Sequence, residues 1–329
     1  MNSGNTLQSG GLGRRIGREF KTELSMLVIF VVFFAVMSFA SPYFLTTNNI
    51  MNVMSQVSST SMLAIGMTIV IITSGIDLSV GSILGLSGMI GGMVLMNTQN
   101  VVLGVAVILL VGMVMGLVNG FLIGYLELPA FIVTLGMMEI GRSLDYVISD
   151  ANTASKFPAI YNFLGTGRIG GVFPVYIIFI FGMFAIFIWI MAKTKFGRFL
   201  YAIGSNKEAA RLTGINVKFN VMMAYVISGL MCGFAAWIMT SRLMACDATY
   251  GDGNEMDAIA AAVIGGTSMS GGKGTLWGTI IGVFLVGFLR NALNILGVNP
   301  YWQGTAIGAV IVIAVLAEKL SKVKVKKGK

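Results

Sequence analysis

The chain has 329 residues, of which 56% are hydrophobic and only 11% are charged. A soluble domain carries about 25% charged residues, so this composition excludes an ordinary soluble fold and indicates a polytopic α-helical membrane protein. The formal net charge of +9 is concentrated in the tails and in one central loop, which favours membrane topology over nucleic-acid binding as its cause. There are two cysteines and no histidine, so metal sites and most acid–base chemistries lack their usual residues.

The chain begins with a Gly/Ser-rich and then basic stretch, residues 1–20, which we expect to be a disordered tail. The apolar run that follows is about 20 residues long, too long for a signal-peptide core, so it is expected to remain as the first transmembrane helix. Ten segments approach spanning length: roughly 24–44, 48–73, 78–97, 101–124, 129–148, 173–192, 218–241, 257–268, 275–295 and 301–318. The second segment begins with polar residues and the eighth is short, so these two fit least well.

Ten crossings place both termini on the same side of the membrane. With the N-terminus in the cytoplasm, the inner segments hold 17 of the 22 Lys and Arg residues, as the positive-inside rule requires. Residues 21–320 are therefore predicted to form a single transmembrane domain, with a cytoplasmic loop at 193–218 and an external loop at about 149–172. Residues 321–329 form a basic C-terminal tail.

Three predicted helices carry glycines at helical spacing. The stripes are Gly81, Gly85, Gly88 and Gly92; Gly112, Gly116, Gly120 and Gly124; and Gly274, Gly278 and Gly282. Small residues let helix backbones approach closely in lipid. The stripes therefore predict a tightly packed bundle.

The first stretch that could carry chemistry is GIDLSVGS at 75–82, which joins two apolar segments. Asp77 is the only acidic residue between Glu23 and Glu127. A carboxylate near the membrane is costly and often functional, which suggests a polar gate or an ion site. The alternative, which we favour, is that Asp77 or Ser79 caps the next helix.

The second stretch is the Gly/Ser-rich segment 265–275. It superficially resembles a phosphate-binding loop, but the pattern G-x-x-x-x-G-K-[ST] fails, since Thr267 stands at the first glycine position and Gly274 follows Lys273. Nucleotide binding by this chain is rejected, and a flexible reversal between two helices is predicted instead. The similarity of this segment to 75–82 hints at an internal repeat, as transporters often have.

Several polar residues lie within the predicted spans and either bridge helices or line a path for a polar solute, with bridging favoured for each one taken singly. They include Glu139, and also Arg142 and Asp145, which could pair locally at i, i+3. Our candidates for the translocation path or its gate are Asp77, Ser79, Asn119, Thr134, Asn291 and Asn294.

The central loop contains a short helix with its own start and stop signals. Ser205 and Glu208 fit a capping box, with Ser205 as the N-cap, and Gly214 supplies the left-handed C-terminal residue. The predicted helix, 206–213, has about two turns, and isolated helices of that length are marginal in water. It is therefore expected to be held by the rest of the protein or offered to a partner.

Four sequence blocks in the same order resemble the membrane permeases of bacterial ABC sugar importers, in the branch that serves ribose, galactose, xylose and related monosaccharides. They are GIDLSVGS at 75–82, PAFIVTLGMM at 129–138, TKFGRFLYAIGSNKEAARLTGINV at 194–217 and EMDAIAAAVIGGTSMSGGKGTLWGTIIG at 255–282. Two departures from the family pattern are Ala130, where Ser is frequent, and GRSLDY at 141–146, where many members have Arg-Gly. Both lie on one predicted helix and bear on which sugar passes.

The resemblance implies a permease domain over 21–320, in a multi-pass protein of the bacterial inner membrane that is not itself an enzyme. It implies a homodimer, a cytoplasmic ATPase subunit that binds ATP and Mg, and a periplasmic binding protein that delivers the sugar; no cofactor or metal is bound by this chain. Residues 204–214 would be the coupling helix that docks on the ATPase. The candidate coupling residues are Gly197, Arg198, Gly204, Ser205, Asn206, Glu208, Ala209, Ala210, Arg211 and Gly214.

Two other functions remain open. An ion-coupled secondary transporter of a small polar solute would need buried acids, for which Asp77 and Glu139 are the candidates. A membrane-embedded enzyme would need a cluster of acids, histidines or metal ligands, and the sequence shows none. Ribose and galactose are the leading sugars, with xylose, inositol and other polyols open, because the soluble partner largely sets specificity in such systems.

Overall fold

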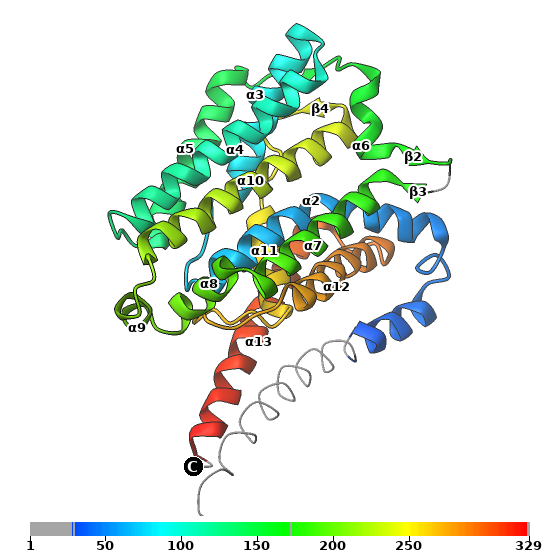
Figure 1. The fold of residues 1–329 in the computed structure, drawn as a ribbon. Coiled ribbons are helices and arrows are strands. Elements are labelled where there is room, and N and C mark those ends of the chain that lie inside the picture. The colour runs from blue at the N-terminus through cyan, green and yellow to red at the C-terminus, as the bar shows by residue number, and fades with distance from the viewer. Residues whose placement is uncertain (1–27, 29, 172, 328–329) are drawn as a thin grey trace, which may run out of the picture.

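The computed structural model describes residues 28, 30–171 and 173–327, and within them the chain is mostly helical (Figure 1). The predicted tail at 1–20 lies outside the described residues. An apolar helix covers Phe30–Ala40. The long helices that follow are α2 (Thr47–Ile72), α3 (Val80–Thr98), α4 (Val101–Gly124), α5 (Ala130–Ser149), α7 (Val175–Lys193), α10 (Val217–Leu243), α12 (Leu276–Ile295) and α13 (Pro300–Lys327).

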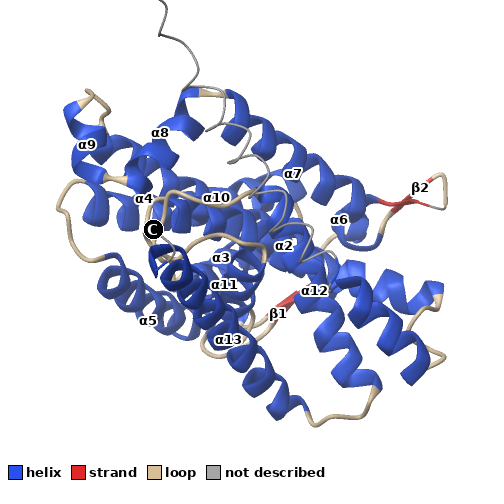
Figure 2. Ribbon diagram, turned by 90° about the horizontal axis from the view of Figure 1, so that it is seen from below, coloured by secondary structure: helices blue, strands red, loops and turns tan. Residues whose placement is uncertain are grey.

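Shorter elements lie between the long helices. They are β1 (Ala154–Ser155), η1 (Ala159–Asn162), α6 (Phe163–Thr166), β2 (Arg168–Ile169), β3 (Phe173–Pro174), α8 (Lys195–Ser205), α9 (Lys207–Leu212), β4 (Ala245–Cys246) and α11 (Asn254–Ile264). The four described strands form two antiparallel pairs, β1 with β4 and β2 with β3. Figure 2 shows that α8 and α9 lie at the opposite side of the molecule from β2.

Six of the described helices are long and apolar enough to cross a membrane, judged by length and composition: α2, α3, α4, α7, α10 and α12. The polytopic α-helical class is therefore confirmed. The second predicted segment is a full helix of 26 residues despite its polar start. The eighth is α11, which has 11 residues and begins earlier than predicted. At 1.5 Å per residue it extends about 16 Å, roughly half of the hydrocarbon thickness.

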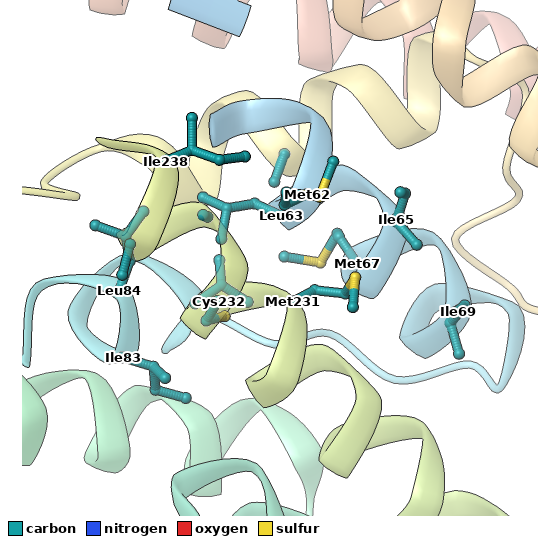
Figure 3. Packing of buried hydrophobic residues seen from close by; sticks show 14 of the residues in the cluster. Met62, Leu63, Ile65, Met67, Ile69, Ile83, Leu84, Met231, Cys232 and Ile238 are labelled. Atoms are coloured by element: carbon teal, nitrogen blue, oxygen red, sulfur yellow. The ribbon is translucent and has the colours of Figure 1, made fainter. Parts of the chain in front are cut away.

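The core forms where α10 packs along α4 and α2. The glycine stripe of α4 makes this approach possible, since a Cβ on Gly112 or Gly116 would collide with the backbone carbonyls of Gly229 or Tyr225 in α10. Apolar side chains fill the neighbouring space between α2, α3 and α10, as Figure 3 shows for Met67, Ile83 and others. The prediction that this stripe brings two helices together is confirmed.

The glycine stripe of α3 has a different partner. A Cβ on Gly81 would collide with the carbonyl of Gly251, and one on Gly92 with Sγ of Cys246. Both of these contacts belong to the non-helical segment between α10 and α11, which runs along α3. Backbone without helical hydrogen bonds is tolerated inside a membrane protein when other protein covers it, and here the glycines let it lie close. The prediction of helix–helix contact is confirmed in the middle of this stripe, where Gly85 faces Asp145 of α5 and Gly88 faces Thr240 of α10, and was wrong at its ends, where Gly81 and Gly92 meet the non-helical segment.

The connections between helices gather at two ends of the bundle. At one end β1 pairs with β4, and Thr153 donates a hydrogen bond to Asp247 at 2.8 Å. At the other end, Lys218 at the start of α10 lies 3.6 Å from Glu127 in the α4–α5 connection. This second group of connections, which includes α8, α9 and the segments 73–79 and 265–275, contains the candidate site.

Candidate functional site

The central loop folds as two consecutive helices, α8 and α9. Thr194 caps α8 by accepting a hydrogen bond from the Gly197 N–H at 3.3 Å. Asn206 separates the two helices and caps α9, since its Oδ1 accepts from the Ala209 N–H at 2.9 Å. Asn is as good an N-cap as Ser, and it leaves the preceding residue free to end α8.

The predicted capping box was therefore wrong. Ser205 ends α8, and Glu208 forms an ion pair with Arg211 at 3.0 Å instead of reaching back to the cap. The predicted C-terminal signal is confirmed, because Gly214 has φ +83° and the Ile215 N–H donates to the Ala210 carbonyl at 3.2 Å, which closes the helix end.

The surface of α9 divides its candidate residues into two groups. Ala210 is only 4% exposed and packs with Ile203, Val221 and Tyr225. Ala209, by contrast, is exposed, as are Glu208 and Arg211. Beside them Leu212 is 85% exposed, although it is apolar. Leu212 was not among the coupling residues predicted from the sequence. It could have been found as an apolar residue on a short charged helix whose inner face is already filled by Ala210.

The start of α8 folds back on the end of α7. Gly197 is buried, and a Cβ there would collide with the carbonyl of Met191. Arg198 donates a hydrogen bond to the Lys193 carbonyl at 3.3 Å. These two candidates therefore fix the direction in which the chain leaves the membrane helix.

The end of α8 packs against two non-helical segments at once. A Cβ on Gly204 would collide with the Ile72 carbonyl, the last residue of α2, and would approach the Gly272 nitrogen to 2.5 Å. The Gly272 N–H in turn donates to that Ile72 carbonyl at 2.9 Å. We call the meeting point of Ile72, Gly204 and Gly272 the three-segment junction. It joins α8 to the connection between α2 and α3 and to the connection between α11 and α12.

Side chains reinforce the junction. Ser74 donates to the Ser270 carbonyl at 3.1 Å, and Tyr201 of α8 donates to the Gly274 carbonyl at 2.8 Å. Within the 265–275 segment the Ser268 N–H donates to the Lys273 carbonyl at 3.0 Å. The sequence predicted a flexible reversal here, but hydrogen bonds to Ile72, Ser74 and Tyr201 hold the segment in place.

Asp77 is the centre of a buried polar cluster. Its Oδ1 accepts from the Ser79 N–H at 3.1 Å and from the Ser79 hydroxyl at 2.6 Å, and its Oδ2 accepts from the Ser228 hydroxyl at 2.8 Å. Asn119 donates to the Ser79 hydroxyl at 2.8 Å. All four side chains are fully buried. Ser79 occupies the N-cap position of α3, which confirms one of the two predicted alternatives, but its own side chain makes no capping hydrogen bond and Asp77 instead accepts from the Ser79 N–H.

The cluster shows where the 73–79 segment runs. Ser228 lies about 16 Å along α10 from its first residue, at 1.5 Å per residue. Because Asp77 contacts Ser228, the segment turns back from the end of α2 into the bundle before α3 begins. Satisfied hydrogen bonds are the condition under which a carboxylate can be buried at such a site.

The remaining path candidates make contacts between elements: Thr134 joins α5 to the 73–79 segment, and Asn291 and Asn294 bridge helices. Thr134 donates to the Ala130 carbonyl at 2.9 Å and to Ile76 at 3.3 Å. Asn291 of α12 exchanges two amide hydrogen bonds with Asn49 of α2, at 2.9 and 2.7 Å. Asn294 accepts from Gln303 of α13 at 2.6 Å. A role in a path therefore stays a prediction for these residues, while their bridging contacts are observed.

The predicted local pairing of Arg142 with Asp145 is not observed. Arg142 donates to the carbonyls of Ala248 and Tyr250, at 2.7 and 2.9 Å, and forms no ion pair with Asp145 among the described residues. An ion pair that the sequence did not reveal joins Asp257 of α11 to Arg290 of α12 at 2.8 Å. The available signal was a single cation in an otherwise apolar helix, which requires an anion nearby.

No group of three His, Cys, Asp or Glu side chains in the described part of the chain could hold a metal ion. This arrangement is suited to transmitting movement between elements. It has an exposed helix, α9, and a short helix, α8, that ends on two connections between membrane helices.

Comparison with known proteins assigns the family. The family described as "Branched-chain amino acid transport system / permease component" matches residues 49–315. The chain belongs to this permease family. A permease component is the membrane subunit of a transport system and is not a catalytic one, so this protein is a multi-pass protein of the bacterial inner membrane.

The chain is similar along nearly its whole length to several named relatives. It is 41% identical over 313 residues to the ribose import permease protein RbsC of Escherichia coli (93% of this chain, 97% of the relative). It is 40% identical to the D-allose transport system permease protein AlsC of the same species (90% and 90%). It is 34% identical to the galactose/methyl galactoside import permease protein MglC (94% and 97%). No solved structure matches the chain.

Proposed function

We propose that this chain is the membrane permease of an ATP-binding-cassette importer that carries a monosaccharide into the cytoplasm. The observation that carries the proposal is the exposed helix α9, joined through α8 to the three-segment junction, in a member of a permease family. The names of the relatives support a pentose or hexose such as ribose, allose or galactose as cargo. The alternative of an ion-coupled transporter gains no support from these names.

We also propose ten crossings, with both termini in the cytoplasm. The charge distribution supports this orientation, and so does the grouping of the connections at two ends of the bundle, since Lys218 and Glu127 meet at the end that contains α8 and α9. The short α11 would cross together with the non-helical segments on either side of it. The α9 end is then cytoplasmic, and the β1–β4 end faces the periplasm.

The partners follow from this orientation. An ATPase subunit that binds ATP and Mg²⁺ would dock on α9, with Ala209 permitting close contact, Leu212 inserted as an apolar anchor, and Glu208 and Arg211 at the rim. A periplasmic binding protein would deliver the sugar to the opposite end. A second copy of the chain would complete a homodimeric path, as the family resemblance implies.

The coupling step is a shift between two conformations of the three-segment junction. Movement of α9 with the ATPase displaces the end of α8, because Asn206 is the only residue between the two helices. Gly204 then displaces the Ile72 carbonyl and Gly272, because these backbone atoms lie so close to Gly204 that not even a Cβ would fit between them. The starts of α3 and α12 follow, since both are connected to the junction through short segments. Each ligand state selects one conformation by its differential contacts.

Transport in a reconstituted system tests the proposal. The chain would be placed in proteoliposomes together with its cognate ATPase and binding protein, and uptake of radiolabelled ribose, allose and galactose would be measured. We expect uptake of one of them to require ATP and the binding protein, and to persist when the proton gradient is collapsed. Uptake that needs the gradient and not ATP would overturn the proposal.

A further inference from the structure

A groove opens between α7 and α12 and ends at Lys193, beside the start of α8. Its volume is about 370 Å³. One side is a stripe of α7 residues spaced four apart, Phe181, Ala185, Trp189 and Lys193, and the other is the first turn of α12 with Trp277 and Ile280. Twelve residues of helix measure about 18 Å, so the groove is long and narrow.

The two ends of the groove differ in chemistry. At one end Phe181 stacks on Phe284 of α12, with ring centroids 6.3 Å apart, which connects the two helices across the groove. At the other end Lys193, in the last turn of α7, contributes the only charge among the lining residues. The walls between these ends are apolar, and the two tryptophans are 62% and 61% exposed.

No described residue neutralises the cationic end of the groove. In the part of the chain that the structure describes, Lys193 forms no ion pair, and neither do Lys195, which follows in α8, or Lys273, which precedes α12 by one turn. All three are exposed. Glu208, the acidic residue of the nearby helix α9, is already paired with Arg211.

We propose that this groove binds one anionic glycerophospholipid. Its acyl chain would lie along the α7 stripe, and its phosphate would meet Lys193. The groove lies on a surface of α7 that also exposes Ile178 and Ile186, as expected of a face turned to hydrocarbon. Tryptophan favours the depth of the headgroups, lysine extends its charge to the membrane surface, and basic pockets between helices bind anionic lipids. The lipid belongs to the cytoplasmic leaflet in the proposed orientation.

Tryptophan fluorescence reports on this groove directly. The substitutions Trp237→Phe and Trp302→Phe leave Trp189 and Trp277 as the only tryptophans of the full-length chain, because the sequence has four. The protein would be placed in vesicles that contain phosphatidylglycerol or phosphatidylcholine with brominated acyl chains, which quench on contact. We expect brominated phosphatidylglycerol to be preferred about fivefold, since one basic residue near an anionic surface contributes roughly 1 kcal/mol.

Two matched pairs of variants locate the effect. Ala185→Phe places a ring in the groove, whereas Ile186→Phe places it on the neighbouring position outside; only the first is expected to abolish the preference. Lys193→Gln is expected to remove the headgroup preference while leaving quenching by both lipids. The reverse tryptophan set, Trp189→Phe with Trp277→Phe, should show no preference.

Three results would overturn the proposal. Equal quenching by both lipids in the chain that keeps Trp189 and Trp277 would mean that the groove does not select an anionic lipid. Absence of quenching at Trp189 and Trp277, while Trp302 is quenched in the reverse set, would mean that protein covers the groove, either a second copy or residues 1–27. An undiminished preference in Ala185→Phe, folded as shown by unchanged thermal unfolding, would place the lipid elsewhere.

Discussion

The backbone N–H of Gly272 donates a hydrogen bond to the carbonyl of Ile72 at 2.9 Å, across a sequence separation that includes most of the membrane helices. This contact joins the connection between α11 and α12 to the end of α2. Gly272 has φ +69°, which favours glycine. Because Gly204 of α8 packs on both residues, a movement of α8 reaches two separate pairs of helices.

Replacement of exposed residues on α9 should weaken attachment of the ATPase. Glu208→Arg places three cations in the small helix, and Leu212→Ala removes its exposed apolar side chain. Truncation of an interface anchor typically costs more than about 1 kcal/mol, so we expect at least roughly fivefold less ATPase to copurify with either variant. Leu45→Ala, at an exposed site before α2, serves as the control. Unchanged copurification in both α9 variants would remove α9 from the interface.

Substitution of Asp77 should affect stability and leave the energy source unchanged. Asp77→Asn loses one of the two carboxylate oxygens that accept hydrogen bonds from Ser79 and Ser228, so we expect a loss of about 1–3 kcal/mol in the free energy of unfolding. Chemical denaturation in detergent measures this. Uptake by the variant should remain independent of the proton gradient. A parent protein whose uptake stops on collapse of the gradient at constant ATP would instead make Asp77 an ion site.

The ion pair between Asp257 and Arg290 should behave as a unit. Arg290→Met leaves the buried carboxylate of Asp257 without its partner, and we expect a destabilisation of about 2–3 kcal/mol, below the value for a fully buried pair because the Arg290 side chain is 35% exposed. The double variant Asp257→Leu with Arg290→Met should regain most of this loss. A double variant as unstable as the single one would show that the pair does more than neutralise a charge.

The glycine stripe of α4 should tolerate no side chain. Gly116→Ala would push α4 away from the Tyr225 carbonyl, and overpacking of this kind costs about 1–3 kcal/mol. Gly182→Ala on α7 is the matched control, because a Cβ there meets no atom within 4 Å. The change in the thermal unfolding temperature relative to the parent should differ in sign or in size between the two variants. Equal behaviour would contradict the packing of α4 on α10.

The sequence predicted the polytopic helical class and the six helices that are long and apolar enough to span, because apolar length and glycine spacing are local properties. The stripe of α4 could be read directly, since both partners are helices. The stripe of α3 could be read only in part, because Gly81 and Gly92 meet the non-helical segment that contains Cys246 and Gly251, and nothing local marks that segment as buried.

The candidate site was predicted in part. Composition and the four sequence blocks located the loop, and Gly214 marked the end of α9. The cap at Asn206 was missed because Ser205 and Asn206 are equally good N-caps, and only the presence of α8 decides between them. The junction at Gly204 depends on contacts between residues far apart in sequence, which spacing cannot reveal.

The most direct test of the coupling account is ATP hydrolysis by the reconstituted complex with and without sugar-loaded binding protein. In the parent protein we expect the loaded binding protein to stimulate hydrolysis. In Gly204→Ala, where the added methyl group collides with Ile72, the ATPase should still bind and hydrolyse at the basal rate, while stimulation and sugar uptake are lost; Gly182→Ala should behave as the parent. Full stimulation and uptake in Gly204→Ala would contradict the account.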